Sequence, residues 1–218
     1  SISDTGLYTV DLSTIGDGEV NVKVTVEDKS GNVASETYTF YLDTKSPTNL
    51  KATIKDAYEE HDGIIYFKKS PEVSLSAEDS GVGVGRFVVN DKEISGNKFS
   101  VSDGSYTVAV KDKLGNQSSN ASLPKLLGMK GSMFVIDGTD PSVVRKSGFS
   151  GDLTESGKTW YSKKPSIVYS LTDKNILSAD IKVNGKNYSQ KLNDSGLYTV
   201  DLSSVSDGPV KVEVTVVD

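Results

Sequence analysis

The sequence predicts an all-β fold made of antiparallel β-sandwiches in tandem, and three observations support this prediction. Apolar and polar residues alternate with a period of two through several valine-rich segments, such as Val20 to Val26 and Val210 to Val216. Turn sequences rich in Gly, Asn and Asp separate these segments. The sequence also repeats itself at about the length of one sandwich domain, whereas no window shows a convincing helical periodicity.

The alternation is clearest between Val20 and Glu27, where valines occupy one face and polar residues the other. Period two with β-branched residues is typical of half-buried antiparallel strands, so we expect almost no helix. The other segments with this pattern carry these apolar faces: Val210, Val212, Val214 and Val216; Tyr106, Val108 and Val110; Tyr38, Phe40 and Leu42; Phe134 and Ile136.

Two turn sequences, Asp28 to Asn32 and Asp112 to Asn116, each follow one valine-rich strand and precede another strand. Gly and Asn adopt positive φ at low cost and Asp caps its own turn, so both predict hairpins between the last two strands of a domain. Tyr106 follows another turn sequence, Asp103-Gly104-Ser105, and stands at the start of the penultimate strand. Sandwich domains often place a tyrosine corner there, with the hydroxyl bonded back to the main chain.

The internal repeat has two levels. Asp4 to Asp28 and Asp194 to Asp218 are identical at 17 of 25 positions, at an offset of 190 (194 − 4). A weaker repeat at an offset of 94 (160 − 66) aligns Tyr66-Phe67 with Trp160-Tyr161. The unit is therefore about one immunoglobulin-like domain long, in two alternating variants. The same offset of 94 pairs Asp79 with Asp173, Asn90 with Asn184, and Asp43…Pro47 with Asp137…Pro141.

These offsets predict three parts. Residues 1–45 are expected to be the last strands of one domain, 46–139 a complete domain, and 140–218 a domain without its last strand, the counterpart of Lys29 to Asp43. That strand either lies outside the printed sequence or, as the less favoured alternative, is donated by a neighbouring chain. An unpaired edge left in its place invites aggregation.

Composition excludes several classes of protein. The 218 residues suffice for two domains and contain no cysteine, which excludes disulfides and cysteine-based catalysis or zinc sites. The net charge of −6, with both signs interspersed, disfavours nucleic-acid binding. We expect no membrane span, because no run of eighteen apolar residues occurs, and no signal peptide, so the chain is interpreted as an internal excerpt of a longer one.

No catalytic site is predicted. The single histidine, His61, lies in a polar stretch that predicts a solvated loop, whereas a catalytic triad needs a buried, oriented imidazole. Glu59, Glu60 and Asp62 share that loop and do not face one another across a cleft, as glycosidase carboxylates do. The glycines between Ser80 and Gly85 precede no helix, so they do not predict a phosphate-binding loop.

Calcium is the one cofactor that the sequence allows. Asp43 and Asp137, with Asp140 beside the second, lie at predicted domain junctions, and Asp28 and Asp112 lie at the nearby hairpins. Hard cations bind several carboxylate and carbonyl oxygens, and a shared ion would stiffen the joint. The favoured alternative is that these residues only cap turns, because no complete calcium-binding ligand series is present.

One loop differs between the domains. Asn32 precedes Phe40 by 8 positions, but Asn116 precedes Phe134 by 18, so the segment from Ser118 to Gly131 holds ten extra residues. Loops on a rigid sandwich often bind ligands, although this loop is expected rather to fold back on its own or the adjacent domain. Its candidate ligand-binding residues are Leu123, Leu126, Leu127 and Met129.

Two adjacent aromatic residues, Trp160 and Tyr161, suggest stacking against a sugar ring. Their alignment with Tyr66 and Phe67 favours a structural role instead.

The order Val-x-Val-x-Asp-x-x-Gly-Asn, an alternating strand, and Asp-x-x-x-Pro resembles the bacterial immunoglobulin-like (Big-type) repeats of Gram-positive cell-surface proteins. The resemblance covers essentially the whole chain and implies tandem immunoglobulin-like antiparallel β-sandwiches in an extended array. It also implies an extracellular location, at the cell surface or attached to the cell wall. The residues that carry it are Val24 to Asn32 with Asp43 to Pro47, and Val108 to Asn116 with Asp137 to Pro141.

The leading functional hypothesis is a non-catalytic structural or adhesive region, in which short Asp-x-x-x-Pro junctions hold neighbouring sandwiches as a semi-rigid stalk or adhesin segment. The expected partners are the adjacent repeats of the same chain. Two alternatives stay open: a module that binds a carbohydrate or host protein, and an accessory spacer of a secreted protease or glycosidase.

Overall fold

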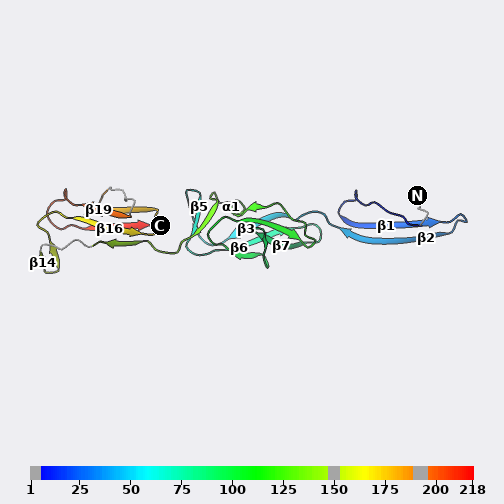
Figure 1. The fold of residues 1–218 in the computed structure, drawn as a ribbon, viewed down its shortest axis with the longest axis horizontal. Coiled ribbons are helices and arrows are strands. Elements are labelled where there is room, and N and C mark those ends of the chain that lie inside the picture. The colour runs from blue at the N-terminus through cyan, green and yellow to red at the C-terminus, as the bar shows by residue number, and fades with distance from the viewer. Residues whose placement is uncertain (1–5, 147–152, 189–195) are drawn as a thin grey trace. The chain divides into compact units, whose positions relative to one another are not determined.

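The computed structural model describes residues 6–146, 153–188 and 196–218, and this part of the chain is nearly all β (Figure 1). Its only helix is the four-residue α1 (Leu123–Leu126). The all-β sandwich fold predicted from the sequence is therefore confirmed. The chain divides into two compact units, Ser1–Ile136 and Asp137–Asp218. Asp4 and Asp194, the first residues of the repeated segments, lie outside the described residues.

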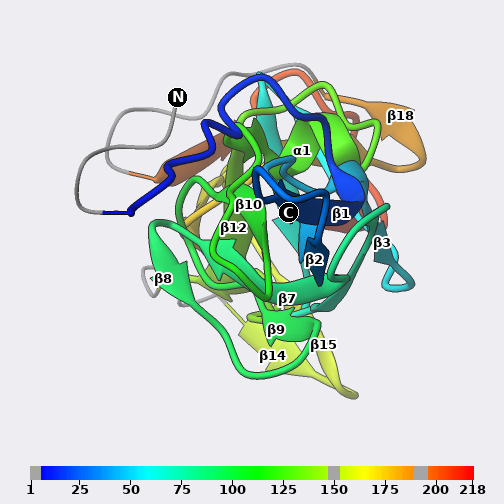
Figure 2. The ribbon, with the colours of Figure 1, turned by 90° about the vertical axis from the view of Figure 1, so that its right-hand side faces the viewer.

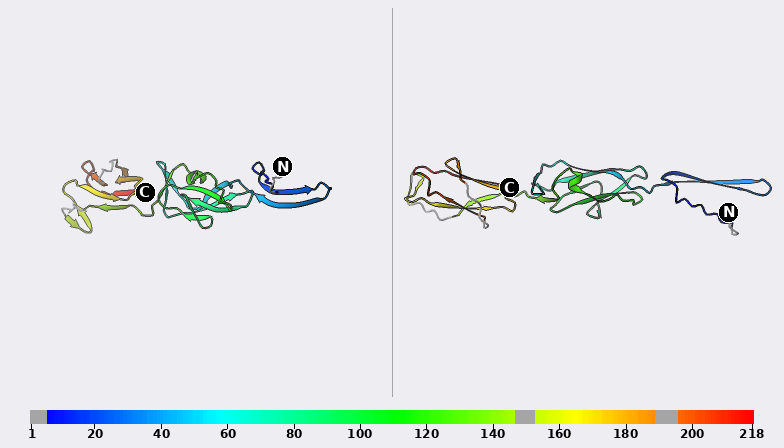
Figure 3. Two further views of the ribbon diagram at one scale, coloured as in Figure 1. Left: turned by 45° about the vertical axis from the view of Figure 1, so that its right-hand side comes forward. Right: turned by 90° about the horizontal axis from the view of Figure 1, so that it is seen from above.

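The first unit begins with a hairpin of β1 (Gly18–Glu27) and β2 (Val33–Leu42), which pair antiparallel from Gly18↔Leu42 to Glu27↔Val33. The two strands lie side by side over their whole length in both views of Figure 3. The turn is closed by the Asp28 carboxylate, which accepts the backbone N–H groups of Ser30 and Asn32 at 2.8 and 2.9 Å. The hairpin predicted at Asp28 to Asn32 is thus confirmed.

A sandwich follows in the same unit, and Figure 2 looks along its strands. Its sheets have the orders β3-β6-β9, β11-β10-β7-β8 and β12-β5-β4. All pairs are antiparallel except β12 on β5, which are parallel. The strands are β3 (Thr48–Ile54), β4 (Glu59–His61), β5 (Ile64–Phe67), β6 (Glu72–Glu78), β7 (Val84–Val89), β8 (Lys92–Glu93), β9 (Lys98–Ser100), β10 (Thr107–Asp112), β11 (Ala121–Ser122) and β12 (Met133–Ile136).

The core of this sandwich forms where the inward positions of these strands meet. Phe134 of β12 packs its ring 6.0 Å from that of Phe67 and 5.8 Å from that of Tyr106, measured between centroids. Full burial of each such side chain stabilises the fold by about 1.5–3 kcal/mol. The Tyr106 hydroxyl accepts the backbone N–H of Ser102 at 2.8 Å, so the tyrosine corner predicted there is confirmed.

The second unit has sheets of order β13-β16-β19 and β18-β17-β20, and the separate hairpin β14-β15. Its core cluster includes Leu171, Ile181, Tyr198 and Val200, all buried. The valines that alternate along β20 pack against this cluster. The strands are β13 (Ser142–Arg145), β14 (Leu153–Glu155), β15 (Lys158–Trp160), β16 (Ser166–Thr172), β17 (Ser178–Val183), β18 (Lys186–Asn187), β19 (Leu197–Asp201) and β20 (Val212–Val217).

The two sandwiches share their strand pairing at the offset of 94. Glu59↔Tyr66 in the first corresponds to Leu153↔Trp160 in the second. They differ in the other neighbour of this strand in the sheet. β5 also pairs with β12, whereas β15 pairs only with β14 in the described part of the second unit. Trp160 is accordingly 54% exposed. The alignment with Tyr66 therefore predicts that Trp160 lies in a strand, but it does not predict how exposed Trp160 is.

Candidate metal centres

Three carboxylates meet where the hairpin passes into the first sandwich. Asp43 lies just after β2, Asp79 just after β6, and Asp112 at the end of β10. One oxygen of each carboxylate lies within 4.8 Å of the chosen oxygens of the other two. These residues are far apart in sequence, so the tertiary fold brings them together.

Local turns orient two of these carboxylates. Asp79 accepts the backbone N–H groups of Gly81 and Gly83 at 3.1 and 2.7 Å. Asp112 accepts the backbone N–H of Asn116 at 2.8 Å and the Asn116 side-chain amide at 2.7 Å. Each side chain is therefore held by the turn that follows its own strand, as the sequence predicts for Asp caps.

The Asp43 carboxylate is held by the neighbouring loop instead. Its Oδ2 accepts the backbone N–H of Val82 at 2.7 Å, and the Asn116 amide donates to the Asp43 carbonyl oxygen at 3.2 Å. A Cβ on Gly81 would collide with the Asp43 carboxylate. A side chain at position 81 would therefore require the Asp43 carboxylate to move from its place in this structure.

The electrostatics favour the ionised form at Asp112, whose residue is only 4% exposed. Burial, the largest single effect, would raise the pKa of Asp112, but hydrogen bonds from the Asn116 side chain and from the turn amides together lower it below its ordinary value. A grouping of ionised carboxylate oxygens with a nearby backbone carbonyl offers the ligand chemistry that calcium prefers.

A second cluster of the same kind lies within the second unit. Oxygens of Asp137, Asp173 and Asp218 lie within 4.8 Å of one another. Asp137 and Asp173 are the counterparts of Asp43 and Asp79 at the offset of 94, and Asp218 follows β20 as Asp112 ends β10. The same three positions of the repeat thus converge twice.

The second cluster differs at the position of Gly81, where it has Asn175. The Asn175 side-chain amide donates to the Asp137 carboxylate, and its backbone N–H donates to Asp173 at 2.8 Å. The Asn175 amide, the backbone N–H of Thr139 and the charge of Lys174 hold the pKa of Asp137 below its ordinary value.

Of the five aspartates proposed from the sequence, Asp43, Asp112 and Asp137 lie in these clusters, and Asp28 and Asp140 do not. Asp28 closes its own hairpin turn, and hydrogen bonds from Asn32 lower its pKa. Asp140 is exposed.

Sequence reasoning missed Asp79, Asp173 and Asp218 as members of a site. The offset of 94 already paired Asp79 with Asp173, and that pairing was the available signal. Turn capping accounts for the hydrogen bonds of Asp79 and Asp112, but it does not require carboxylates from three separate segments to meet.

The extra loop of the first sandwich closes its core. Leu123 and Met129 are buried, and Leu126 and Leu127 pack against the same cluster. The backbone N–H of Leu123 donates to the Tyr106 carbonyl oxygen at 3.0 Å, which fixes the start of α1 on the sandwich. Leu123 and Met129 are thus part of their own core, whereas Leu126 and Leu127 are only partly buried. A ligand-binding role for these four side chains stays a prediction.

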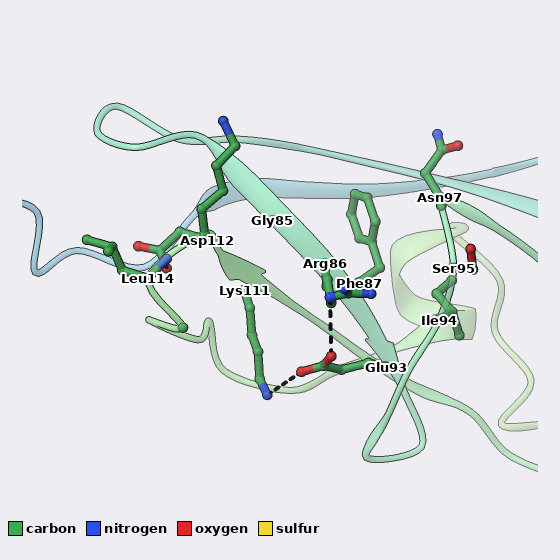
Figure 4. A pocket seen from close by; sticks show the side chains of 13 residues that line it. Gly85, Arg86, Phe87, Glu93, Ile94, Ser95, Asn97, Lys111, Asp112 and Leu114 are labelled. Atoms are coloured by element: carbon green, nitrogen blue, oxygen red, sulfur yellow. Dashed lines mark hydrogen bonds and ion pairs between the residues drawn. The ribbon is translucent and has the colours of Figure 1, made fainter.

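A polar hollow of about 780 Å³ lies beside β7 and the turn after β10 (Figure 4). Glu93 lies between Arg86 and Lys111, at 3.5 and 2.8 Å, so its charge is matched from two sides. The Lys111 ammonium, as hydrogen-bond donor and charge, lowers the pKa of Glu93. Phe87 is buried. This hollow therefore lacks an exposed ring on which a sugar could stack among its lining residues.

His61 lies at the end of β4, half-buried, with its ring 6.4 Å from that of Tyr66 between centroids. The solvated loop predicted for it is replaced by a short strand, since β4 pairs with β5. In the described residues, no helix is long and apolar enough to cross a membrane.

No protein-family model matches the chain, and no curated protein matches it. One similar solved structure is a tetra-tandem repeat in the extending region of a large adhesion protein, at 19% identity and a TM-score of 0.34. Another is the Bacteroides ovatus mixed-linkage glucan utilization locus protein SGBP-B with a heptasaccharide, at 18% identity and a TM-score of 0.18. The matches cover 100% and 90% of this chain, but only 58% and 46% of those chains. At these TM-scores, neither likeness carries an argument.

Proposed function

We propose that this chain is a non-catalytic repeat region of an extracellular bacterial surface protein, and that it acts as a semi-rigid stalk or adhesin segment. Its neighbours in the array are then its main partners. The assignment to bacterial immunoglobulin-like repeats rests on the sequence resemblance, and the sandwich fold agrees with it.

The hydrogen bonds on both sides of the first junction support this proposal most. Asp17, on the hairpin side, accepts the backbone N–H and the hydroxyl of Thr44 at 3.0 and 2.8 Å. Asp43, on the sandwich side, accepts the N–H of Val82. A linker held from both directions has little freedom to bend, which is what a spacer needs.

The second junction shares part of this pattern, on the side of the first unit. Asp103 stands where Asp17 stands, before the glycine that precedes the penultimate strand, and accepts the backbone N–H of Ile136 at 2.8 Å. Asp137 then accepts the N–H of Thr139 at 3.1 Å. In both copies, the aspartate before the penultimate strand thus bonds to the backbone at or just after the last strand of its domain, as expected of a repeated structural element.

We also propose that calcium binds the two aspartate clusters and stiffens the junctions further. An ion held by Asp43, Asp79 and Asp112 would join the linker to two loops of the next sandwich. The stalk function does not depend on this, because the linker is already hydrogen-bonded.

Small-angle scattering of the full chain tests the stalk. An elongated particle is expected, with a maximum dimension that changes little with temperature, because the junctions resist bending. A compact profile, or one typical of freely jointed domains, would contradict the proposal.

Calcium titration calorimetry tests the metal contribution separately. Asp79→Asn keeps an oxygen that accepts the Gly81 and Gly83 amides but removes a charge. It should weaken calcium binding by about tenfold or more, since even an outer-shell partner is worth about 10–100-fold. Asp140→Asn, an exposed carboxylate outside both clusters, is the matched control. Equal calcium affinity in the two variants, or no calcium binding by the unmodified chain, would contradict the calcium proposal. Neither outcome would affect the scattering result.

A further inference from the structure

The last strand of the first sandwich, β12, is bonded on both of its edges. On one edge it pairs parallel with β5 over its whole length, Met133–Ile136. On the other edge, the backbone of Phe134 exchanges two N–H···O=C hydrogen bonds with Gly104, both at 2.9 Å. The Asp103 carboxylate also accepts the backbone N–H of Ile136 at 2.8 Å, where the strand ends. The exit of the chain from this sandwich is therefore held from two sides.

The strand directions place the entry and the exit of the chain at opposite ends of this sandwich. β3 follows the Asp43 linker, and the carboxylates of Asp79 and Asp112, which meet that of Asp43, stand at the ends of β6 and β10. The antiparallel bridge Gly104↔Phe134 shows that β12 runs opposite to the segment leading into β10, so β12 ends at the far end. A pull on the two ends of the sandwich therefore draws β12 along its own axis, away from the entry.

Such a pull loads the pairing of β12 with β5 in shear. The two strands are parallel, so the start of β5 faces the entry and the end of β12 is the exit. Tension therefore pulls β12 along β5 in the direction of both strands. The hydrogen bonds of a parallel pair are evenly spaced, so they share the load and must break together. A pair of strands that is peeled from one end loses its bonds one after another instead.

Side-chain packing adds to this resistance. Phe134 is fully buried, with its ring 6.0 Å from that of Phe67 on β5 and 5.8 Å from that of Tyr106, so β12 slides only if this ring leaves the core. The entry strand β3 is held less firmly, because its ladder with β6 shifts register after Thr48 and its buried residue is the small Ala52. When β3 and then β4 give way, tension acts directly between the start of β5 and the end of β12, which is the same shear.

We propose that the first sandwich bears tension, and that the pair β12–β5 is the clamp that must break before its core unfolds under load. This inference rests on the stalk function proposed above, because a stalk that is anchored at one end and loaded at the other carries tension. All contacts of the clamp lie between Ile64 and Ile136, inside one sandwich. Forced unfolding is governed by the unfolding rate, so the clamp acts on that rate.

The test compares two directions of pulling on the same sandwich by single-molecule force spectroscopy. The chain has no cysteine, so introduced cysteines are unique handles. Handles at Lys45→Cys and Thr139→Cys pull β12 along its axis, whereas handles at Lys68→Cys and Thr139→Cys peel β5 and β12 apart from their common end. All three positions are exposed. The highest unfolding force should be several times larger in the first direction, while the two unloaded chains unfold at the same urea concentration.

Matched variants separate mechanical from thermodynamic stability. Phe134→Leu and Phe87→Leu remove rings from the same buried core, but Phe87 lies on β7, which is joined to neither end of the sandwich. Both should lower the urea midpoint, yet only Phe134→Leu should raise the unfolding rate at fixed force along β12, by about tenfold or more. Asp103→Ala should raise this rate too, and Asp103→Asn, which keeps an oxygen for the N–H of Ile136, should restore most of the resistance.

The clamp is overturned by equal unfolding forces in the two directions, or by equal effects of the two phenylalanine variants on the unfolding rate under load. These outcomes are distinct from a failure of the stalk, which the scattering experiment tests. An elongated particle with equal forces would leave the stalk and remove the clamp. A compact particle whose unfolding force depends on direction would remove the stalk and support the clamp.

Discussion

Strands β5 and β15 occupy the same place in two successive sandwiches and pair with the preceding strand in the same register. β5 lies in the core, with Ile65 at 0% exposure, whereas every residue of β15 is exposed. The difference follows from the neighbouring strand, because β12 covers β5 and no counterpart of β12 covers β15 in the described residues. A strand is therefore buried by its neighbours in the fold and not by its own pattern alone.

The largest difference between the two strands is expected when a side chain is truncated at the same position of each. Ile65→Ala should lower the free energy of unfolding of the first unit by about 2–5 kcal/mol, because it leaves a cavity in a packed core. Thr159→Ala, at the corresponding position of β15, should change that of the second unit by less than about 0.5 kcal/mol. Urea unfolding followed by circular dichroism measures both, and equal losses would show that β15 is covered in solution.

A second pair of variants concerns Gly85 of β7 and its counterpart Ala179 of β17. A Cβ on Gly85 would collide with the backbone of Asp112, where the ladder between β7 and β10 shifts register. Gly85→Ala should destabilise the first unit by about 1–3 kcal/mol through overpacking. Ala179→Gly should cost the second unit only about 0.5–1 kcal/mol, from the greater freedom of glycine when unfolded. A stabilising Gly85→Ala in thermal unfolding would contradict this account.

Acid should affect both units through the junction aspartates. The folded-state pKa values of Asp112 and Asp137 are lowered, so each contributes stability that is present above the unfolded pKa of about 3.9 and is lost as pH falls through the folded value. Asp112→Asn should flatten the pH dependence of unfolding below about pH 4 for the first unit only. Asp137→Asn should do the same for the second unit. Urea midpoints measured between neutral pH and acid check this, and an unchanged slope in either variant would count against it.

The smallest effect is expected at the exposed ion pair between Lys98 and Glu72, which joins β9 to β6 at 2.7 Å. Position 166 of β16, the counterpart of Glu72, is a serine. Glu72→Ser should therefore shift the free energy of unfolding by less than about 0.5 kcal/mol, and salt should reduce the shift further. A larger decrease in the free energy of unfolding at high salt would show that Glu72 stabilises the fold by more than its ion pair with Lys98.

The features predicted correctly from the sequence are those that depend on neighbouring residues in the chain. The hairpin turn at Asp28 to Asn32 and the tyrosine corner at Tyr106 depend on a few consecutive residues, and both form as predicted. The offset of 94 also transfers the register of β4 and β5 to β14 and β15.

The candidate site could be predicted only in part. Asp43 and Asp137 stand out because they begin the Asp-x-x-x-Pro junctions, but Asp79 and Asp173 become members of a site only when the loop after β6 or β16 reaches the linker. Likewise, the direction taken by Leu123 and Met129 depends on space left in the core, which no local pattern reports.

The all-β class, the repeat length and the turn chemistry could be predicted from the sequence, because alternation, glycine conformation and aspartate capping act over a few residues. Tertiary contacts determine which aspartates meet, that the extra loop closes the core, and that Trp160 is exposed in the described part of the chain. These depend on contacts between distant segments, whose distances no run of neighbouring residues contains.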